Sequence, residues 1–275
     1  MEAPLFKREL FAVIAGPLVL ICIVWAPGWV SALLISVLVV IAGDELCRMA
    51  RGSGLATGRY LPVVALAGVL AAAAIYGPAG LGFAVATVVV AAPAIHLVHA
   101  SAPVGALAGT AVDVFGIIYL GITGACFAWL RTMPADEITG IRLLIFFLVV
   151  IWIGDSGAYY VGKNLGRHKM APILSPKKTW EGLAGGVAAT FGAAAIFQTL
   201  FPLPFDWPHI FSLAAILSVA APVGDLIVSL FKRDTGVKDS SSLIPGHGGL
   251  LDRTDSLLFA APFILLFLVA VGLMP

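Results

Sequence analysis

The chain has 275 residues, of which 60% are hydrophobic and only 11% are charged, with a net charge of +1. A soluble domain typically carries about 25% charged residues, so the composition excludes an ordinary water-soluble protein. Three cysteines, Cys22, Cys47 and Cys126, lie in apolar stretches without paired spacing, which argues against a disulfide framework or a zinc site. We interpret them as packing residues.

Apolar segments recur along the whole chain. Because a spanning helix needs roughly 20 mostly apolar residues, we predict about nine spans, of which the first two are short enough to form a tilted hairpin. These spans fall at about 10–26, 28–42, 61–76, 79–98, 104–130, 141–161, 183–203, 210–231 and 256–274. Lys7 and Arg8 precede the first span, which we expect to be an uncleaved helix and not a signal peptide.

Basic residues are distributed unevenly among the connecting segments. With a cytosolic N-terminus, fourteen of the 16 Lys and Arg residues fall in the cytosolic segments, and only Arg131 and Arg142 fall outside them. Those segments are 1–9, 43–60, 99–103, 162–182 and 232–255. The positive-inside rule therefore predicts an all-α polytopic integral membrane protein with a cytosolic N-terminus and the C-terminus on the opposite side.

No separate soluble domain is visible in the sequence. We divide the chain into residues 1–140, with about five transmembrane helices, and residues 141–275, which carry two polar segments at the cytosolic side, 155–182 and 225–255. The glycine-rich stretch 182–186 is typical of helices that pack closely in lipid.

The first polar segment begins within a predicted span. Asp155 lies near the cytosolic end of that span, where an unpaired carboxylate costs about 3 kcal/mol or more, so we expect it to have a partner. Ser175, Lys177 and Lys178 follow in the same segment.

The second polar segment combines acids, bases, glycines and a histidine. Asp225, Ser229 and Lys232 share one helix face, and Asp252 and Asp255 share another if the last helix begins there. Carboxylate oxygens suit Mg²⁺, which usually completes its shell with water and substrate phosphate. Nearby basic side chains complement phosphate, and glycine permits backbone amides to approach closely. These groups are Lys177, Lys178, Lys232, Arg233, Lys238 and Arg253, with His247, Gly248 and Gly249.

Several residues have simpler interpretations. Basic loops arise from topology alone, and Asp252 with Arg253 is also typical of a helix start. Asp113, in the fifth predicted span, is either a buried hydrogen-bonded acid or a second functional group. His96 and His99 have no acidic neighbours in the sequence, and we interpret them as interfacial.

Two stretches resemble one enzyme family. Residues 229–255, SLFKRDTGVKDSSSLIPGHGGLLDRTD, look like the signature of phosphatidate cytidylyltransferases, and residues 155–182, DSGAYYVGKNLGRHKMAPILSPKKTWEG, are similar to that family's second block. Together they cover about a fifth of the chain. The resemblance implies that phosphatidate and CTP react with Mg²⁺ to give CDP-diacylglycerol and pyrophosphate, in phospholipid biosynthesis.

The resemblance also implies roles. The acids that match Asp225 and Asp252 hold a metal centre that pairs a divalent ion with K⁺. From the chemistry of the displacement we assign the other roles, beginning with Asp255 or Asp155 as further metal ligands. Phosphate binding falls to Lys232, Arg233, Lys238 and Arg253, while His247 donates a hydrogen bond. The substrate-binding set is Asp155, Ser175, Lys177, Lys178, Ser229, Gly248 and Gly249. We expect a multi-pass protein of the cell (inner) membrane with its active site facing the cytoplasm, a homodimer, and no nucleic-acid partner.

Other classes stay open at this point. An ion transporter or channel also places acids such as Asp113, Asp155 and Asp225 in the membrane. A CDP-alcohol phosphotransferase or lipid kinase is a second enzyme class, although the former normally shows an Asp-Gly pair that this chain lacks. A noncatalytic scaffold is a third, but it would not need the intact acids and bases of the signature.

Overall fold

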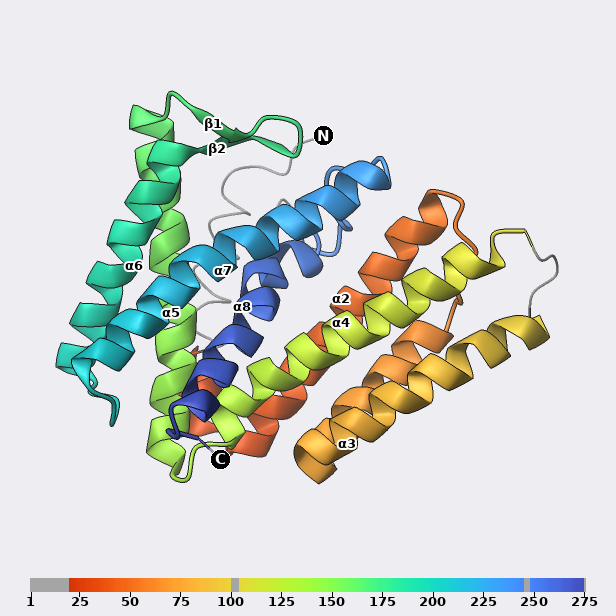
Figure 1. Ribbon diagram of the computed structural model, residues 1–275, viewed down its shortest axis with the longest axis horizontal. Coiled ribbons are helices and arrows are strands. Elements are labelled where there is room, and N and C mark those ends of the chain that lie inside the picture. Colours follow the sequence, from red (N-terminus) through yellow and green to blue (C-terminus); the bar gives the residue numbers. More distant parts are fainter. Residues whose placement is uncertain (1–19, 100–103, 245–247, 275) are drawn as a thin grey trace. The chain divides into compact units, whose positions relative to one another are not determined.

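The computed structural model describes residues 20–99, 104–244 and 248–274. In this part of the chain, seven helices are long and apolar enough to cross a membrane. The chain is therefore a polytopic α-helical membrane protein (Figure 1). The helices are α2 (Gly28–Gly52), α3 (Leu61–His99), α4 (Ala106–Thr132), α5 (Glu137–Leu165), α6 (Trp180–Leu200), α7 (Trp207–Asp234) and α8 (Leu251–Ala270).

Helix α3 contains two of the predicted spans, 61–76 and 79–98. Its two parts meet at Gly77, whose backbone is not helical (φ 63°, ψ −149°), and the chain reverses direction there (Figure 1). Glycine tolerates the positive φ, and the following Pro78 has no amide hydrogen to continue a helix. The predicted span 10–26 falls largely outside the described residues, so the total of about nine spans stays a prediction, as does the orientation of the termini.

A short antiparallel hairpin, β1 (Lys169–Ala171) with β2 (Ser175–Thr179), joins α5 to α6 (Figure 1). The all-α prediction omitted these strands because the segment is polar, contains Pro172 and Pro176, and has no alternating apolar pattern. The hairpin closes onto the next helix through the Trp180 amide, which donates to the His168 carbonyl at 3.0 Å.

Side-chain caps fix the starts of α5 and α6. The Asp136 carboxylate accepts a hydrogen bond from the Thr139 amide at 2.8 Å, and the Thr179 hydroxyl accepts one from the Gly182 amide at 3.1 Å. Such bonds satisfy amides that the first turn of a helix leaves without partners. The bond from Thr139 also holds the pKa of Asp136 below its usual value.

The described chain forms two compact units, each built from segments distant in sequence. The first contains residues 32–128 and 231–254, and the second contains residues 20–31, 129–230 and 255–274. The division at residue 140 made from the sequence separates two consecutive parts of the chain. Each compact unit instead contains segments from both sides of residue 140.

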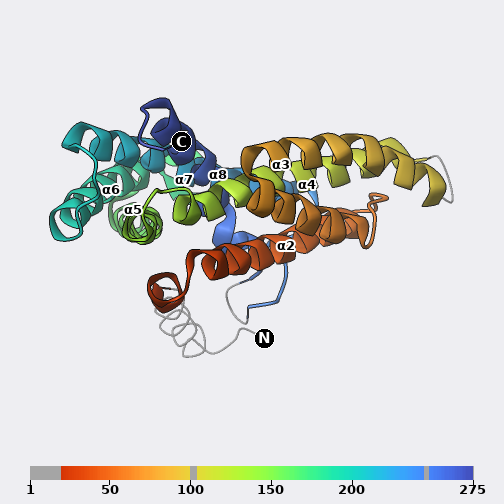
Figure 2. The ribbon, with the colours of Figure 1, turned by 90° about the horizontal axis from the view of Figure 1, so that it is seen from below.

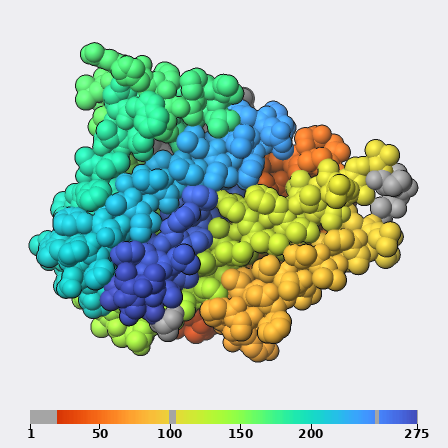
Figure 3. Space-filling view, viewed as in Figure 1, coloured from red at the N-terminus to blue at the C-terminus, as the bar shows by residue number. Residues whose placement is uncertain are grey.

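In the first unit, α4 lies beside the second part of α3 (Figure 1, Figure 2), and the space-filling view shows the atoms of these two segments next to each other (Figure 3). Large apolar side chains on the outside of α3 are exposed, as expected of a lipid-facing helix. They include Val64, Ile75, Tyr76, Phe83, Val90, Leu97 and Val98.

In the second unit, α5 and α6 approach closely through glycines. A Cβ atom at Gly157 would lie 2.5 Å from the Cβ atom of Ala189, and one at Gly185 would overlap Val161. Because a larger residue at either position would separate the helices, the prediction that the glycine-rich stretch serves helix packing is confirmed.

Candidate functional site

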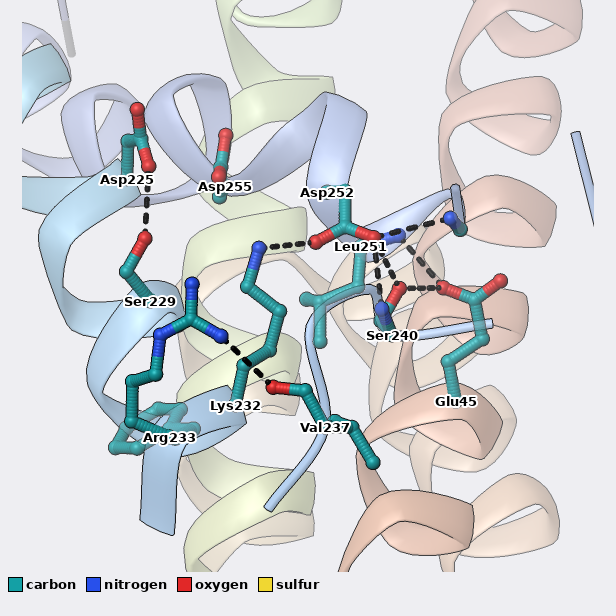
Figure 4. A network of polar contacts seen from close by, with 12 residues as sticks. Glu45, Asp225, Ser229, Lys232, Arg233, Val237, Ser240, Leu251, Asp252 and Asp255 are labelled. Carbon is teal, nitrogen blue, oxygen red and sulfur yellow. Dashed lines mark hydrogen bonds and ion pairs between the residues drawn. The ribbon is translucent and has the colours of Figure 1, made fainter. Parts of the chain in front are cut away.

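Asp252 is the most heavily hydrogen-bonded acid of the predicted set. It lies in the first turn of α8, in the first unit. Its Oδ2 atom accepts from the Ser240 amide at 2.8 Å, the Ser240 hydroxyl at 3.0 Å and the Gly249 amide at 3.0 Å. The signature segment therefore folds around this carboxylate (Figure 4).

The other oxygen of Asp252 faces a cation. Lys232, in the last turn of α7, places its Nζ atom 2.6 Å from Oδ1, and the two side chains are only 12% and 5% exposed. Charge-assisted bonds of this length are strong because little water competes for them. In Figure 4, Asp252 Oδ1 accepts the bond from Lys232, whereas Oδ2 accepts three bonds. Oδ1 therefore has the greater capacity to bind a further ligand.

A second carboxylate, Glu45 of α2, contacts the same segment (Figure 4). It is 4% exposed. It accepts from the Ser241 hydroxyl at 2.6 Å and from the amides of Leu250 and Leu251 at 3.0 and 2.8 Å. It also shares the single hydrogen of the Ser240 hydroxyl, whose oxygen is 2.9 Å away, with Asp252 Oδ2. Glu45 lies about 200 residues away in sequence from these donors, and no sequence argument had included it.

Gly248 and Gly249 each occupy a position that requires glycine, for different reasons. Gly248 has φ +81°, a conformation that favours glycine, and it pairs with Ile244 in an antiparallel bridge. A Cβ atom at Gly249 would overlap the Ser240 hydroxyl and lie 2.5 Å from Glu45 Oε2. Any side chain at Gly249 would therefore displace the donors and acceptors that surround Asp252.

The second unit has its own group of charged and polar side chains. Lys178 of β2 places Nζ 2.8 Å from Asp225 Oδ2 and donates to the Pro222 carbonyl at 3.3 Å. Ser229, one turn after Asp225 on α7, donates to Asp225 Oδ1 at 3.2 Å. The Asp225 side chain is 38% exposed, so its oxygens are accessible.

Asp155 lies on α5 at a small pocket of the same unit. The lining combines apolar side chains with the hydroxyls of Ser218 and Thr190. Asp155 interacts electrostatically with the nearby charges of Asp225 and Lys178. Among the described residues, Lys178 forms its ion pair with Asp225 and not with Asp155, so the expected partner of Asp155 stays a prediction.

The remaining predicted residues lie on β2, on α7 and α8, and between these two helices. Arg233 donates to the Val237 carbonyl at 3.2 Å, and Lys238, Arg253 and Lys177 are exposed. Ser175 begins β2 and pairs with Ala171. Asp255 is buried, and its Oδ1 atom accepts from the Ser256 amide at 2.7 Å. His247 lies outside the described residues.

The described residues contain no group of three or more His, Cys, Asp or Glu side chains arranged to hold a metal ion. Asp225 and Asp252 each offer a carboxylate oxygen with remaining capacity, and Ser229 adds a hydroxyl beside Asp225. Asp252 belongs to the first unit and Asp225 to the second. Either carboxylate by itself fits Mg²⁺ only with water or phosphate as additional ligands, which is the usual way Mg²⁺ binds.

Asp113 is separate from these groups. It is fully buried in α4, where its Oδ2 atom accepts from the Gly58 amide and lies 2.7 Å from His96 Nε2. Of the two roles left open, this geometry supports the buried hydrogen-bonded acid, which connects α4 to α3 and to the turn before α3. His96 therefore has an acidic neighbour in space, which the sequence did not show because the two residues meet only after helices α3 and α4 pack together. Its place at the membrane interface stays a prediction.

The family model described as the Cytidylyltransferase family matches residues 6–271, nearly the whole chain. The chain belongs to the cytidylyltransferase family. This confirms the family resemblance seen in the two polar segments.

Among individual relatives of this cytidylyltransferase-family chain are three bacterial proteins named phosphatidate cytidylyltransferase. The Bacillus subtilis protein is 44% identical over 153 residues, covering 56% of this chain and 55% of its own. The Brucella suis protein is 41% identical over 152 residues, with 55% of each covered. The Haemophilus influenzae protein is 45% identical over 136 residues, covering 48% and 47%. The chain spans about half the length of these curated relatives.

Sequence reasoning missed three side chains of the hydrogen-bond network that includes Asp252 in this cytidylyltransferase-family chain: Ser240, which contacts Asp252, and Glu45 and Ser241, which bond to each other. Glu45 was placed in a connecting loop because the predicted span stopped at residue 42, whereas α2 continues through Asp44 and Glu45 to Gly52. The available signal was the spacing of Asp44 and Arg48, which are four residues apart and form an ion pair at 2.6 Å. Such a pair indicates that the helix continues beyond the apolar run and includes Glu45.

Proposed function

We propose that this protein is a phosphatidate cytidylyltransferase, which condenses phosphatidate with CTP to give CDP-diacylglycerol and pyrophosphate. The observation that carries the proposal is the signature segment folded around Asp252, with Lys232 at 2.6 Å and backbone amides on the opposite side. The names of the relatives, at 41–45% identity, agree with it.

The reaction is an in-line displacement at phosphorus. A phosphate oxygen of phosphatidate forms a bond to the α-phosphorus of CTP, and the bond from that phosphorus to the bridging oxygen of the β-phosphate breaks, so pyrophosphate leaves with the electron pair. The nucleophile is already anionic near neutral pH, because the second pKa of a phosphate monoester is about 6. A strong general base is therefore not required.

The barrier arises from bringing a dianion to a triphosphate. Charge neutralisation and alignment should consequently supply most of the rate acceleration. Lys178 and Lys232 are the best-placed cations, because each is partly buried beside an aspartate and electrostatic interactions are stronger where water is excluded. Exposed Arg233, Lys238, Arg253 and Lys177 would neutralise the phosphate oxygens that extend toward solvent.

We propose Mg²⁺ as the cofactor, held by Asp225 and Asp252, with Asp255 or Asp155 as further ligands and K⁺ as a second cation. Support for Asp225 comes from its accessible carboxylate, and support for Asp252 comes from the remaining capacity of Oδ1. When bound, Mg²⁺ offsets triphosphate charge. Lys232 would then be the group that keeps Oδ1 oriented when the metal is absent.

The substrates suggest where the reaction takes place. Acyl chains stay in the bilayer while the phosphatidate headgroup lies at its surface, and CTP is cytosolic, so we propose an active site at the cytoplasmic face of the cell (inner) membrane. Nine spans with a cytosolic N-terminus, and a homodimer, belong to the same proposal. The distribution of Lys and Arg supports this orientation.

The test uses purified protein in detergent with phosphatidate micelles, Mg²⁺ and CTP labelled at the α-phosphate. We expect label to enter the lipid phase only when phosphatidate and Mg²⁺ are both present, and to stop entering it in Asp252→Asn. The matched control is Asp206→Asn, an exposed acid before α7, which should retain activity. A folded wild type that transfers no label would refute the proposal, and ion flux in liposomes would then test the transporter class.

A further inference from the structure

Glu45 holds both sides of the signature segment. On the side before the undescribed residues 245–247, it accepts from the Ser240 and Ser241 hydroxyls. On the side after them, it accepts from the Leu250 and Leu251 amides. Each carboxylate oxygen of Glu45 receives one hydroxyl and one amide, so all the contacts depend on an acceptor with two equivalent oxygens.

The amides that Glu45 accepts belong to the start of a helix. Leu251 is the first residue of α8 and Leu250 precedes it, and the first amides of a helix have no partner within the helix. A carboxylate at this end also interacts favourably with the helix dipole. Glu45 therefore caps α8 from a different helix, one residue before Asp252.

Ser240 connects the two carboxylates. Its hydroxyl lies 2.9 Å from Glu45 Oε2 and 3.0 Å from Asp252 Oδ2, and its amide donates to Asp252 at 2.8 Å. A movement of Glu45 would thus shift Ser240 and the start of α8 together, and both of them position Asp252.

We propose that Glu45 is a positioning residue of the active site, which fixes the start of α8 and thereby the place of the Asp252 carboxylate. Glu45 itself need not touch substrate, because its four donors saturate it. The catalytic consequence rests on the proposed function, whereas the structural consequence does not.

Glu45→Gln is the informative variant because it preserves size. Its amide group would face one hydroxyl, which can rotate and accept, and one backbone N–H, which cannot. At least one α8 amide would lose its acceptor. The matched control is Asp44→Asn, an acid on the same helix turn that pairs with Arg48 and Arg51.

Two measurements decide the proposal. Hydrogen exchange by mass spectrometry, on peptides covering residues 248–253, should show faster exchange in Glu45→Gln than in wild type or Asp44→Asn. Label transfer should show kcat lower by about 100-fold, the effect of a misplacement near 1 Å, with the KM for CTP within about twofold, because transition-state stabilisation alone is lost. A purely structural role would lower the amount of folded protein without changing kcat per folded molecule.

Unchanged exchange at residues 248–253 would overturn the proposal whatever the activity. Faster exchange with normal kcat would overturn the catalytic role and leave the proposed function intact. A wild type without transferase activity would remove the proposed function and the catalytic role, while exchange would still decide whether Glu45 holds α8. If Glu45→Gln does not fold, Ser241→Ala removes one of the four donors, and the same two readouts apply.

Discussion

Lys232 Nζ lies 2.6 Å from Asp252 Oδ1, with both side chains nearly withdrawn from solvent. Removing one member of a buried pair leaves an uncompensated charge, which typically costs about 3–5 kcal/mol. We therefore expect Lys232→Met to lower the Tm in detergent more than the double variant Lys232→Met/Asp252→Asn, in which no charge is left unpaired. Equal Tm values for the two variants would mean that water or other donors already compensate Asp252.

Gly249 lies against Ser240 and Glu45, with no room for a Cβ atom. Gly249→Ala should displace the hydroxyl and the carboxylate, at a cost of about 1–3 kcal/mol for overpacking, and should abolish label transfer. The control is Gly192→Ala, an α6 position where a Cβ atom meets nothing within 4 Å, which should retain or raise the Tm because alanine is the better helix former. Full activity in Gly249→Ala would contradict the geometry.

Lys178 pairs with Asp225 at a partly exposed position, with 22% and 38% of the side chains accessible. Such pairs contribute about 0–1 kcal/mol to stability, so Lys178→Met should barely change the Tm. If Lys178 binds a substrate phosphate, activity should fall about 10- to 100-fold, the equivalent of one lost charge-assisted bond. Lys169→Met, at the exposed first position of strand β1, is the control, and equal activity of both variants would remove Lys178 from the substrate set.

His96 is a side-chain partner of the fully buried Asp113, together with the more distant Cys47 thiol. His96→Ala should destabilise the protein by about 1–3 kcal/mol, because it removes one hydrogen bond from a buried carboxylate, without changing activity per folded molecule. Thr87→Ala, which removes only an exposed bond within the same helix, should leave the Tm near that of wild type. Loss of activity at normal Tm would instead favour the second role considered for Asp113, that of a functional group.

The cap of α5 should make stability depend on pH. The hydrogen bond from the Thr139 amide lowers the pKa of Asp136 in the folded protein. The ionised Asp136 therefore stabilises the folded state fully above the unfolded pKa of about 3.9. This stabilisation is lost as the pH falls through the lower folded pKa. Thermal unfolding should show that Asp136→Ala lowers the Tm at pH 7 and that the difference from wild type shrinks below about pH 4. A difference independent of pH would assign the effect to packing.

The positions of most helices could be predicted from the sequence because a bilayer imposes length and apolarity on each span separately. The two parts of α3 were predicted as separate spans for this reason, and Gly77-Pro78 marks the break between them. Hairpin β1–β2 was missed because its register depends on two short polar strands, where no periodicity identifies a buried face.

The sequence by itself determined the membrane class, the family and the acids and bases of the signature, since these depend on composition and on residues near one another in the chain. Only the tertiary structure decided that Lys232 pairs with Asp252, that Lys178 pairs with Asp225, and that Glu45 caps α8. The physical reason is that a buried polar group needs a partner, but partners from other helices are selected by packing. The contact between Glu45 and Ser240 could not be predicted from spacing, because the two residues are 195 residues apart in the sequence.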